Sequence, residues 1–231
     1  MTGLTPEEAT ALILSLRVAG VAVLVSLPVG LAVAMVLARG RWPGLWLLNA
    51  LVHLPLILPP VVTGYFLLLA FGRKGPVGAF LEQAFGLVFA FRWTGAALAA
   101  AVMGFPLMVR AMRLAIEAVD PRLEEAASTL GASRLAVFRS VTLPLILPGV
   151  IAGAVLAFAK AMGEFGATIT FVSNIPGQTQ TLPSAIYTAL QVPGGDATAG
   201  RLALISVIVA IGAVLLSEFI ARRVAARIRG A

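Results

Sequence analysis

The sequence predicts an all-α membrane protein that crosses the bilayer about five times. Of its 231 residues, 60% are hydrophobic and only 12% are charged, and the mean hydropathy is +1.00. Charged residues make up about a quarter of ordinary soluble domains, so this composition excludes that class. Five stretches are each long enough to span a bilayer, which takes about 20 mostly apolar residues in a helix. We expect residues 1–231 to form a single transmembrane domain.

The predicted spans follow one another along the chain with short connections. They cover residues 11–38, a segment within 42–71, and residues 93–109, 143–170 and 202–221, the last with Glu218 near its end. Residues 183–192 are expected to form a short helix on the outer surface. An additional membrane hairpin in this region is rejected because both of its crossings would be undersized and polar.

Lysine and arginine residues set the predicted orientation, because cytoplasmic loops are enriched in them. With the N-terminus outside, the inner side receives eleven of the seventeen basic residues, namely Arg39, Arg41, Arg110, Arg113, Arg122, Arg134, Arg139, Arg222, Arg223, Arg227 and Arg229. We therefore expect the N-terminus outside and the C-terminus inside. The net charge of +7 is attributed to these loops and not to nucleic-acid binding. The start, MTGLTPEEAT, has no basic residue before its first apolar run and does not resemble a cleaved signal peptide.

The inventory of reactive side chains is small. The chain has no cysteine and one histidine, His53, which excludes disulfides, iron–sulfur clusters and Cys/His zinc sites. No Ser/His/Asp grouping emerges, so we expect neither a catalytic nor a metal site. His53 is interpreted as a polar group satisfied by its neighbours in preference to a ligand. Gly149, Gly153 and Ala157, spaced by four, suit close helix packing.

Three prolines, Pro55, Pro59 and Pro60, lie inside the second predicted span in the segment HLPLILPPVVTG. Proline removes a backbone donor and kinks a helix, which membranes tolerate only where protein or a water-filled cavity satisfies the freed groups. Two interpretations stay open: a kink buried by neighbouring helices, or a bent helix that lines a pathway.

A charged island near the middle of the chain, at about residues 110–142, predicts two short amphipathic helices on the cytoplasmic side. Asp120 and Pro121 suit a helix start, Gly131 a tight turn, and Ser133 the cap of a second helix. Pro144 is expected where the chain turns into the fourth span. Such a unit could rest on lipid, or dock into a groove of another protein.

The island resembles a known motif. Glu125-Ala126-Ala127, then Gly131, then Val141-Thr142-Leu143-Pro144 is similar to the EAA motif of ABC-importer permeases, with Val141 in place of the usual isoleucine. In that family the motif is a cytoplasmic coupling helix seated in a cleft of the ATPase subunit. The resemblance implies a type I ABC-importer permease fold, with ATPase-coupling residues Glu125, Ala126, Ala127, Gly131, Leu143 and Pro144.

Two further segments, HLPLILPPVVTGY and MGEFGATITFVSNIPG, look like the corresponding segments of molybdate ABC transporter permeases. The resemblance implies a permease homodimer in the lipid of a bacterial inner membrane, importing molybdate by alternating access with two ATP-binding subunits and an extracytoplasmic molybdate-binding protein. The chain has no G-x-x-x-x-G-K-[ST] loop, so ATP and Mg²⁺ are expected on the partner subunit and no cofactor in this chain. Alternatives are a permease for sulfate, tungstate or another oxyanion and, from other classes, a passive channel or a membrane enzyme.

An oxyanion needs a wet, polar route, because a dianion in hydrocarbon is prohibitively costly. The candidate pathway or gate residues are Pro55, Pro59, Pro60, Thr63, Glu164, Thr168, Thr170, Ser173 and Asn174, and each of the threonines, Ser173 and Asn174 could equally be a packing residue. For Glu164 we expect hydrogen bonds from backbone amides of residues 163–173 or an ion pair with Lys160. The alternative is a solvated interfacial charge.

Overall fold

The chain folds into helices, and no strand occurs among residues 4–229, which the computed structural model describes. The helices are α1 (Pro6–Arg39), α2 (Leu45–Ile57), α3 (Pro60–Phe71), α4 (Pro76–Phe85), α5 (Trp93–Glu117), α6 (Pro121–Thr129), α7 (Arg134–Val137), α8 (Leu143–Met162), α9 (Gly166–Val172), α10 (Leu182–Leu190) and α11 (Asp196–Arg229). A π-helical turn, Phe138–Thr142, joins α7 to α8.

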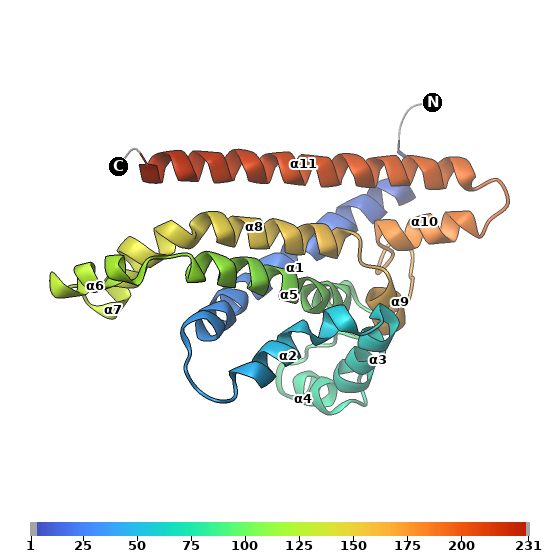
Figure 1. Cartoon of the computed structure of the whole chain (residues 1–231). Helices are drawn as coiled ribbons and strands as arrows, with labels where there is room; N and C mark the ends of the chain where they lie inside the picture. The colour runs from blue at the N-terminus through green and yellow to red at the C-terminus, as the bar shows by residue number, and fades with distance from the viewer. Residues whose placement is uncertain (1–3, 230–231) are drawn as a thin grey trace.

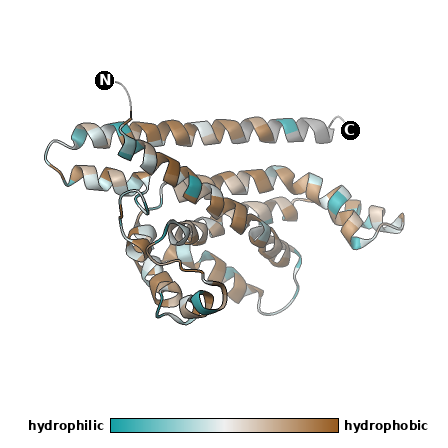
Figure 2. Ribbon diagram, turned by 180° about the vertical axis from the view of Figure 1, so that it is seen from behind, coloured by the Kyte–Doolittle hydropathy of each residue, from teal (hydrophilic) through white to brown (hydrophobic). Residues whose placement is uncertain are grey.

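Four helical segments of the described chain are long and apolar enough to cross a membrane: α1, α5, the continuous helix Arg134–Met162, and Asp196–Leu216 of α11. The pair α2 and α3 adds a fifth if it counts as one span. Hydrophobic residues predominate along these helices, and hydrophilic residues recur in α6 and α7 (Figure 2). The expected all-α membrane architecture of about five spans is therefore confirmed.

Helix α5 forms the centre of the bundle. In its most apolar window 61% of the residues are buried, against 11% for α11, which lies at the periphery. Met103, Met108, Met112 and Ile116 are fully buried along α5. Gly149 and Gly153 of α8 leave no room for a side chain against Ala115 and Met108 of α5, which confirms the close packing predicted for the small residues of this segment.

The second predicted span contains a bend that is sharper than the proline kink expected from the sequence. Helix α2 ends at Ile57, α3 begins at Pro60, and the two axes are bent by 115°. The break lies at Leu58 and Pro59, while Pro55 sits inside α2 without ending it. Because neither Pro59 nor Pro60 has a backbone N–H, two successive hydrogen bonds are lost and the helix ends, whereas Pro55 removes only one and the helix continues past it.

The fourth span ends earlier than expected. The sequence prediction of 143–170 is wrong at its carboxyl end, because α8 stops at Met162 and α9 begins at Gly166. Lys160, Gly163 and Glu164 mark the break in the sequence, but the apolar residues that resume at Phe165 made the two helices read as one span. The predicted island also begins too early, since α5 continues to Glu117 and contains Arg110 and Arg113.

Two short helices flank the long ones. Helix α10 confirms the short helix expected at 183–192, and α4 was not predicted. Helix α1 begins at a capping box in which Thr5 and Glu8 satisfy each other's backbone N–H groups. The last helix, α11, contains the predicted fifth span, and the side chain of Glu218 lies outside the described residues.

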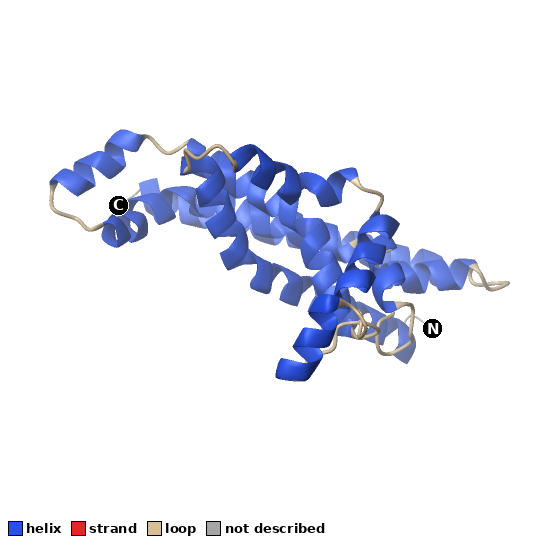
Figure 3. Cartoon of the chain, turned by 90° about the horizontal axis from the view of Figure 1, so that it is seen from below, coloured by secondary structure: helices blue, strands red, loops and turns tan. Residues whose placement is uncertain are grey.

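The helices run between two ends of the molecule. At one end lie α6 and α7 together with the carboxyl end of α11, and at the other lie the start of α1 and α10 (Figure 1). The view from below shows the same separation of the two chain ends (Figure 3). The regions that carry the predicted functional residues, α6–α7 and α3–α9, are therefore distinct places joined by the long helices.

Candidate functional site

The first candidate region is residues 120–137, which contain α6 and α7 and are here called the coupling unit. Asp120 caps α6, its Oδ1 accepting a hydrogen bond of 2.9 Å from the Arg122 backbone N–H. Ser133 caps α7 by accepting from the N–H of Ala136 at 3.3 Å. Both caps confirm the predicted helix starts.

Gly131 makes the turn between these helices. Its φ is +85°, a left-handed conformation that L side chains rarely adopt. The backbone N–H of Ala132 donates to the Ala127 carbonyl and that of Gly131 to the Ser128 carbonyl, which ends α6. The predicted tight glycine turn is confirmed.

The carboxyl side of the unit differs from the prediction. Pro144 does not turn the chain, because α7, the π-helical turn and α8 form one continuous helix from Arg134 to Met162. Within the turn the Leu143 N–H donates to the Phe138 carbonyl, five residues back. This wider turn directly precedes Pro144, which lacks an N–H and would crowd the carbonyl of Ser140 in a regular helix. Leu143 and Pro144 are half-buried at the start of α8.

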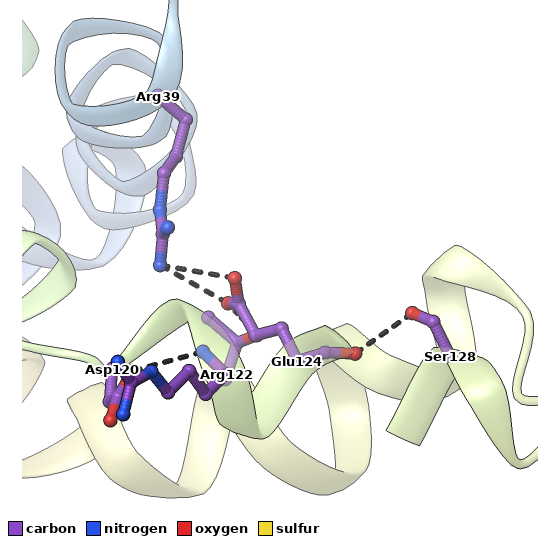
Figure 4. Close-up of polar contacts among 6 residues, drawn as sticks. Arg39, Asp120, Arg122, Glu124 and Ser128 are labelled. Atoms are coloured by element: carbon purple, nitrogen blue, oxygen red, sulfur yellow. Dashed lines mark hydrogen bonds and ion pairs between the residues drawn. The ribbon is translucent and has the colours of Figure 1, made fainter. Parts of the chain in front are cut away.

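An ion pair ties the coupling unit to the bundle (Figure 4). The Arg39 guanidinium, at the end of α1, lies 3.2 Å from both carboxylate oxygens of Glu124. Thr142 Oγ1 donates to Glu124 Oε1 at 2.7 Å. Glu124 therefore joins α6 to α1 and to the π-helical turn, whereas the carboxylate of its neighbour Glu125 is exposed and bonds to none of the side chains that the structure describes.

The coupling unit exposes three leucines among its polar side chains. Leu123, Leu130 and Leu135 are 49%, 89% and 65% exposed, and α6 buries none of its residues. Ala126 is exposed and Ala127 half-buried beside them. Three exposed leucines on a polar, capped projection are typical of a surface that another protein covers.

The second candidate region is the contact between the two broken spans, formed by Pro60, Thr63 and Gly64 of α3 with Gly166, Ala167 and Thr170 of α9, and here called the α3/α9 junction. A Cβ added at Gly64 would lie 2.5 Å from the Ala167 carbonyl oxygen, and one at Gly166 would lie 2.7 Å from Pro60 Cβ. The backbones thus approach as closely as glycine permits.

The junction brings together several of the predicted pathway residues. Thr63 and Thr168 are buried, and Thr170 is half-buried with its hydroxyl bonded to the Gly166 carbonyl. Thr63 Oγ1 has no hydrogen-bond partner within residues 4–229. Pro59 and Pro60 are exposed and Pro55 half-buried. A buried, unpartnered hydroxyl costs about 1–3 kcal/mol, so Thr63 is a polar group without its usual compensation.

Glu164 organises the entry to α9. It is 3% exposed, and its Oε1 accepts from the Ala167 N–H at 2.9 Å while its Oε2 accepts from Lys160 Nζ at 3.0 Å. Both contacts expected from the sequence are present. The alternative of a solvated interfacial charge is wrong, because the carboxylate is enclosed between α8 and α9.

Ser173 and Asn174 take part in a different set of contacts. Ser173 is exposed at the end of α9 with φ of +66°, uncommon for a residue with a side chain. Asn174 Nδ2 donates to Thr188 Oγ1 of α10 at 2.7 Å, and its Oδ1 is buried without a partner in the described chain. These two residues connect α9 to α10, and their bonded partners lie outside the α3/α9 junction.

Sequence reasoning missed the contacts that hold the opposite end together. Arg201 of α11 donates to the buried Glu8 of α1 at 2.7 Å, and the Leu182 N–H of α10 donates to Ser15 Oγ at 2.7 Å. The T-P-E-E capping-box pattern at the start of α1 could have located Glu8. Nothing local points to Arg201 as the partner of Glu8, or to Leu182 as the partner of Ser15.

Comparison with known proteins places this arrangement in a family. The family model described as "Binding-protein-dependent transport system inner membrane component" matches residues 26–230. The chain belongs to this family. It shares 59% identity over 219 residues, 95% of this chain and 96% of the relative, with the Molybdenum transport system permease protein ModB of Escherichia coli (strain K12).

The chain is also similar to a sulfate permease and to a chain of a solved transporter structure. The Sulfate transport system permease protein CysT of Salmonella typhimurium (strain LT2) is 37% identical over 95% of this chain and 80% of its own length. A chain in the crystal structure of a bacterial alginate ABC transporter in complex with alginate pentasaccharide-bound periplasmic protein matches with a TM-score of 0.75 at 18% identity, covering 95% of this chain and 80% of that chain. The fold is that of type I ABC-importer permeases.

Proposed function

We propose that this chain is the membrane-spanning permease of an ATP-driven importer of molybdate. The identity of 59% to a molybdenum permease, against 37% to a sulfate permease of the same family, supports the choice of anion. In this proposal two copies of the chain assemble with two ATP-binding subunits and an extracytoplasmic binding protein. ATP and Mg²⁺ belong to the ATP-binding subunits, since this chain carries no phosphate-binding loop.

The observation that carries the mechanism is the continuous helix from Arg134 to Met162. At 1.5 Å per residue its 29 residues extend about 43 Å. One end begins in the coupling unit and the other ends beside Glu164 and the α3/α9 junction. A movement of the coupling unit, driven by closure of the ATP-binding subunits, would therefore be carried along one helix to Met162, and Glu164 links this end of α8 to α9 through Lys160 and Ala167.

The α3/α9 junction is the proposed gate of alternating access. Its glycine contacts exclude an anion while they hold, and separation of α3 from α9 would expose Thr63, Thr168 and Thr170, whose hydroxyls can bond an oxyanion in place of water. Glu164 fixes the start of α9 through Ala167 and Lys160. An acid is a poor ligand for an anion, so its role is to position α9.

The orientation proposed is N-terminus outside and C-terminus inside. It is supported by the position of the coupling unit and the end of α11 at one end of the molecule, with the start of α1 at the other (Figure 1). The arginine-rich segments gather at the former end, as expected for the cytoplasmic side.

Uptake of ⁹⁹Mo-labelled molybdate by the complex reconstituted in liposomes tests the proposal. Accumulation should require ATP and the binding protein, and unlabelled tungstate and sulfate should reveal the rank order by competition. Absence of ATP-dependent molybdate uptake in a complex that imports sulfate would reject molybdate as the substrate and favour the sulfate alternative.

A further inference from the structure

A cavity of about 280 Å³, lined mainly by residues with polar or charged side chains, lies between α2 and α5. Asn49, His53, Arg110, Arg113, Leu114 and Glu117 line it. Its α5 residues occupy the last two turns before α6, so the cavity lies at the same end of the molecule as the coupling unit. The α2 residues lie before the break at Pro59, and the cavity is therefore on the coupling-unit side of the α3/α9 junction.

The cavity has an excess of positive charge. Two arginines face one carboxylate, Glu117, among the residues that line it. Arg113 uses its Nε to bond Glu117 Oε1 at 2.7 Å and its Nη1 to bond Asn49 Oδ1 at 3.1 Å. A guanidinium has five N–H donors, so three donors of Arg113 stay available after both contacts. Glu117 and Asn49 thus fix the orientation of the Arg113 guanidinium and leave some of its N–H donors free to bind a ligand.

Arg110 is the uncompensated charge of the cavity. None of the carboxylates whose side chains the structure describes pairs with it, and it lies one turn from Arg113, which repels it. His53 Nδ1 lies 2.8 Å from the Asn49 carbonyl and must donate to it, which leaves the Nε2 without a protein partner among the described residues. Arg110 is exposed, so a ligand can reach its guanidinium from outside the chain.

We propose that this cavity binds a tetrahedral oxyanion, held by Arg110 and Arg113. The planar guanidinium fork matches the oxygen spacing of such anions and bonds two oxygens at once. The volume exceeds that of a five-atom anion and leaves room for water around it. Two sources share this chemistry: the transported anion after it has passed the junction, in which case the site rests on the proposed function, and the phosphate of an anionic lipid headgroup.

The test uses the nucleotide-free complex of permease and ATP-binding subunits in nanodiscs, without the binding protein. Equilibrium binding of ⁹⁹Mo-labelled molybdate is measured in phosphatidylcholine nanodiscs for wild type, Arg110→Gln and Arg113→Gln. Phosphatidylglycerol retained from the membrane is measured by native mass spectrometry on the same proteins. Arg41→Gln is the matched control, because it removes one exposed arginine between α1 and α2, outside the cavity.

We expect Arg110→Gln to weaken molybdate binding at least about tenfold, as loss of a charge-assisted contact would, with Arg41→Gln unchanged. Unchanged molybdate binding with loss of retained phosphatidylglycerol in Arg110→Gln assigns the same site to a lipid phosphate. If Arg110→Gln changes neither, the proposal is overturned, even where Arg113→Gln has an effect, because Arg113 also links α2 to α5. Uptake by the wild-type complex is measured separately. A failure of that uptake would reject the proposed function, while the binding data would still show whether Arg110 holds an oxyanion.

Discussion

The coupling unit and the α3/α9 junction lie at opposite ends of one continuous helix and are held by different means. In the coupling unit, Asp120, Gly131 and Ser133 define the structure through bonds to their own neighbours in sequence, and its leucines stay exposed. In the junction, Gly64 and Gly166 allow helices a hundred residues apart to touch through their backbones. A projection defined by local bonds keeps its shape while its surroundings change, whereas a contact made of close backbone approach is either closed or broken. The coupling unit is therefore suited to transmit movement as a rigid body, and the α3/α9 junction is suited to open and close.

The largest effect should come from Gly64→Val. The added side chain would clash with the Ala167 backbone and Thr170 Cβ, which cannot move aside easily. The substitution should therefore lower the stability of the junction by about 3 kcal/mol or more. The thermal midpoint of the purified complex and molybdate uptake should both fall. Gly20→Val is the matched control, since nothing lies within 4 Å of a Cβ there, and its effect should stay within about 1 kcal/mol. Equal effects of the two substitutions would refute a tightly closed junction.

Glu164→Gln should follow in size. The amide keeps the shape and an acceptor for the Ala167 N–H but loses the charge that faces Lys160, a change worth about 1.5–3 kcal/mol for a hydrogen bond to a charged group. Uptake should weaken while the ATP-binding subunits still co-purify. Glu82→Gln, which alters an exposed pair with Arg73 at 3.9 Å, should leave uptake unchanged. Wild-type uptake in Glu164→Gln at limiting substrate would remove the positioning role of Glu164.

Gly131→Val should affect only the coupling unit. A β-branched side chain at φ of +85° costs about 1–2 kcal/mol, although nothing crowds it. We expect the ATP-binding subunits to dissociate during purification, with the membrane spans still inserted. Gly131→Asn should retain them, because asparagine tolerates this conformation. Retention by both variants would show that the turn does not orient α6.

The smallest effect is expected for Arg39→Gln. Its pair with Glu124 is partly exposed, with 33% and 24% of the two side chains accessible, and such pairs contribute about 0.2–1 kcal/mol. Assembly should persist, and the number of ATP molecules hydrolysed per anion imported should rise slightly. A complete loss of assembly would mean that the ion pair, and not the caps and the glycine turn, sets the position of the coupling unit.

The same contrast explains how much the sequence could predict. Asp120, Gly131 and Ser133 were predicted because caps and turns are local chemistry that residue type and spacing reveal. The end of α8 at Met162 was missed because the span was extended through the charged Glu164 into the apolar residues of α9. The straight passage through Pro144 was missed because a π-helical turn leaves no mark in the pattern of apolar residues.

The junction lay beyond sequence reasoning for a different reason. Thr63 and Thr170 were chosen as polar residues in apolar segments, but their place at the junction depends on the 115° bend and on the packing of α3 against α9. The cavity around Arg110 was also missed, because that arginine was counted only as a basic residue of a loop. Tertiary contacts decide both sites.

Thiol labelling of two alanine-to-cysteine variants tests most directly whether the coupling unit is a cytoplasmic docking surface. The chain has no native cysteine, and Ala136 in α7 and Ala197 in α11 are exposed at opposite ends. We predict that Ala197→Cys reacts with a membrane-impermeant maleimide in intact cells. Ala136→Cys should react only in inverted vesicles and should become protected when the ATP-binding subunits are bound. Labelling of Ala136→Cys from outside, or equal labelling with and without those subunits, would contradict the account.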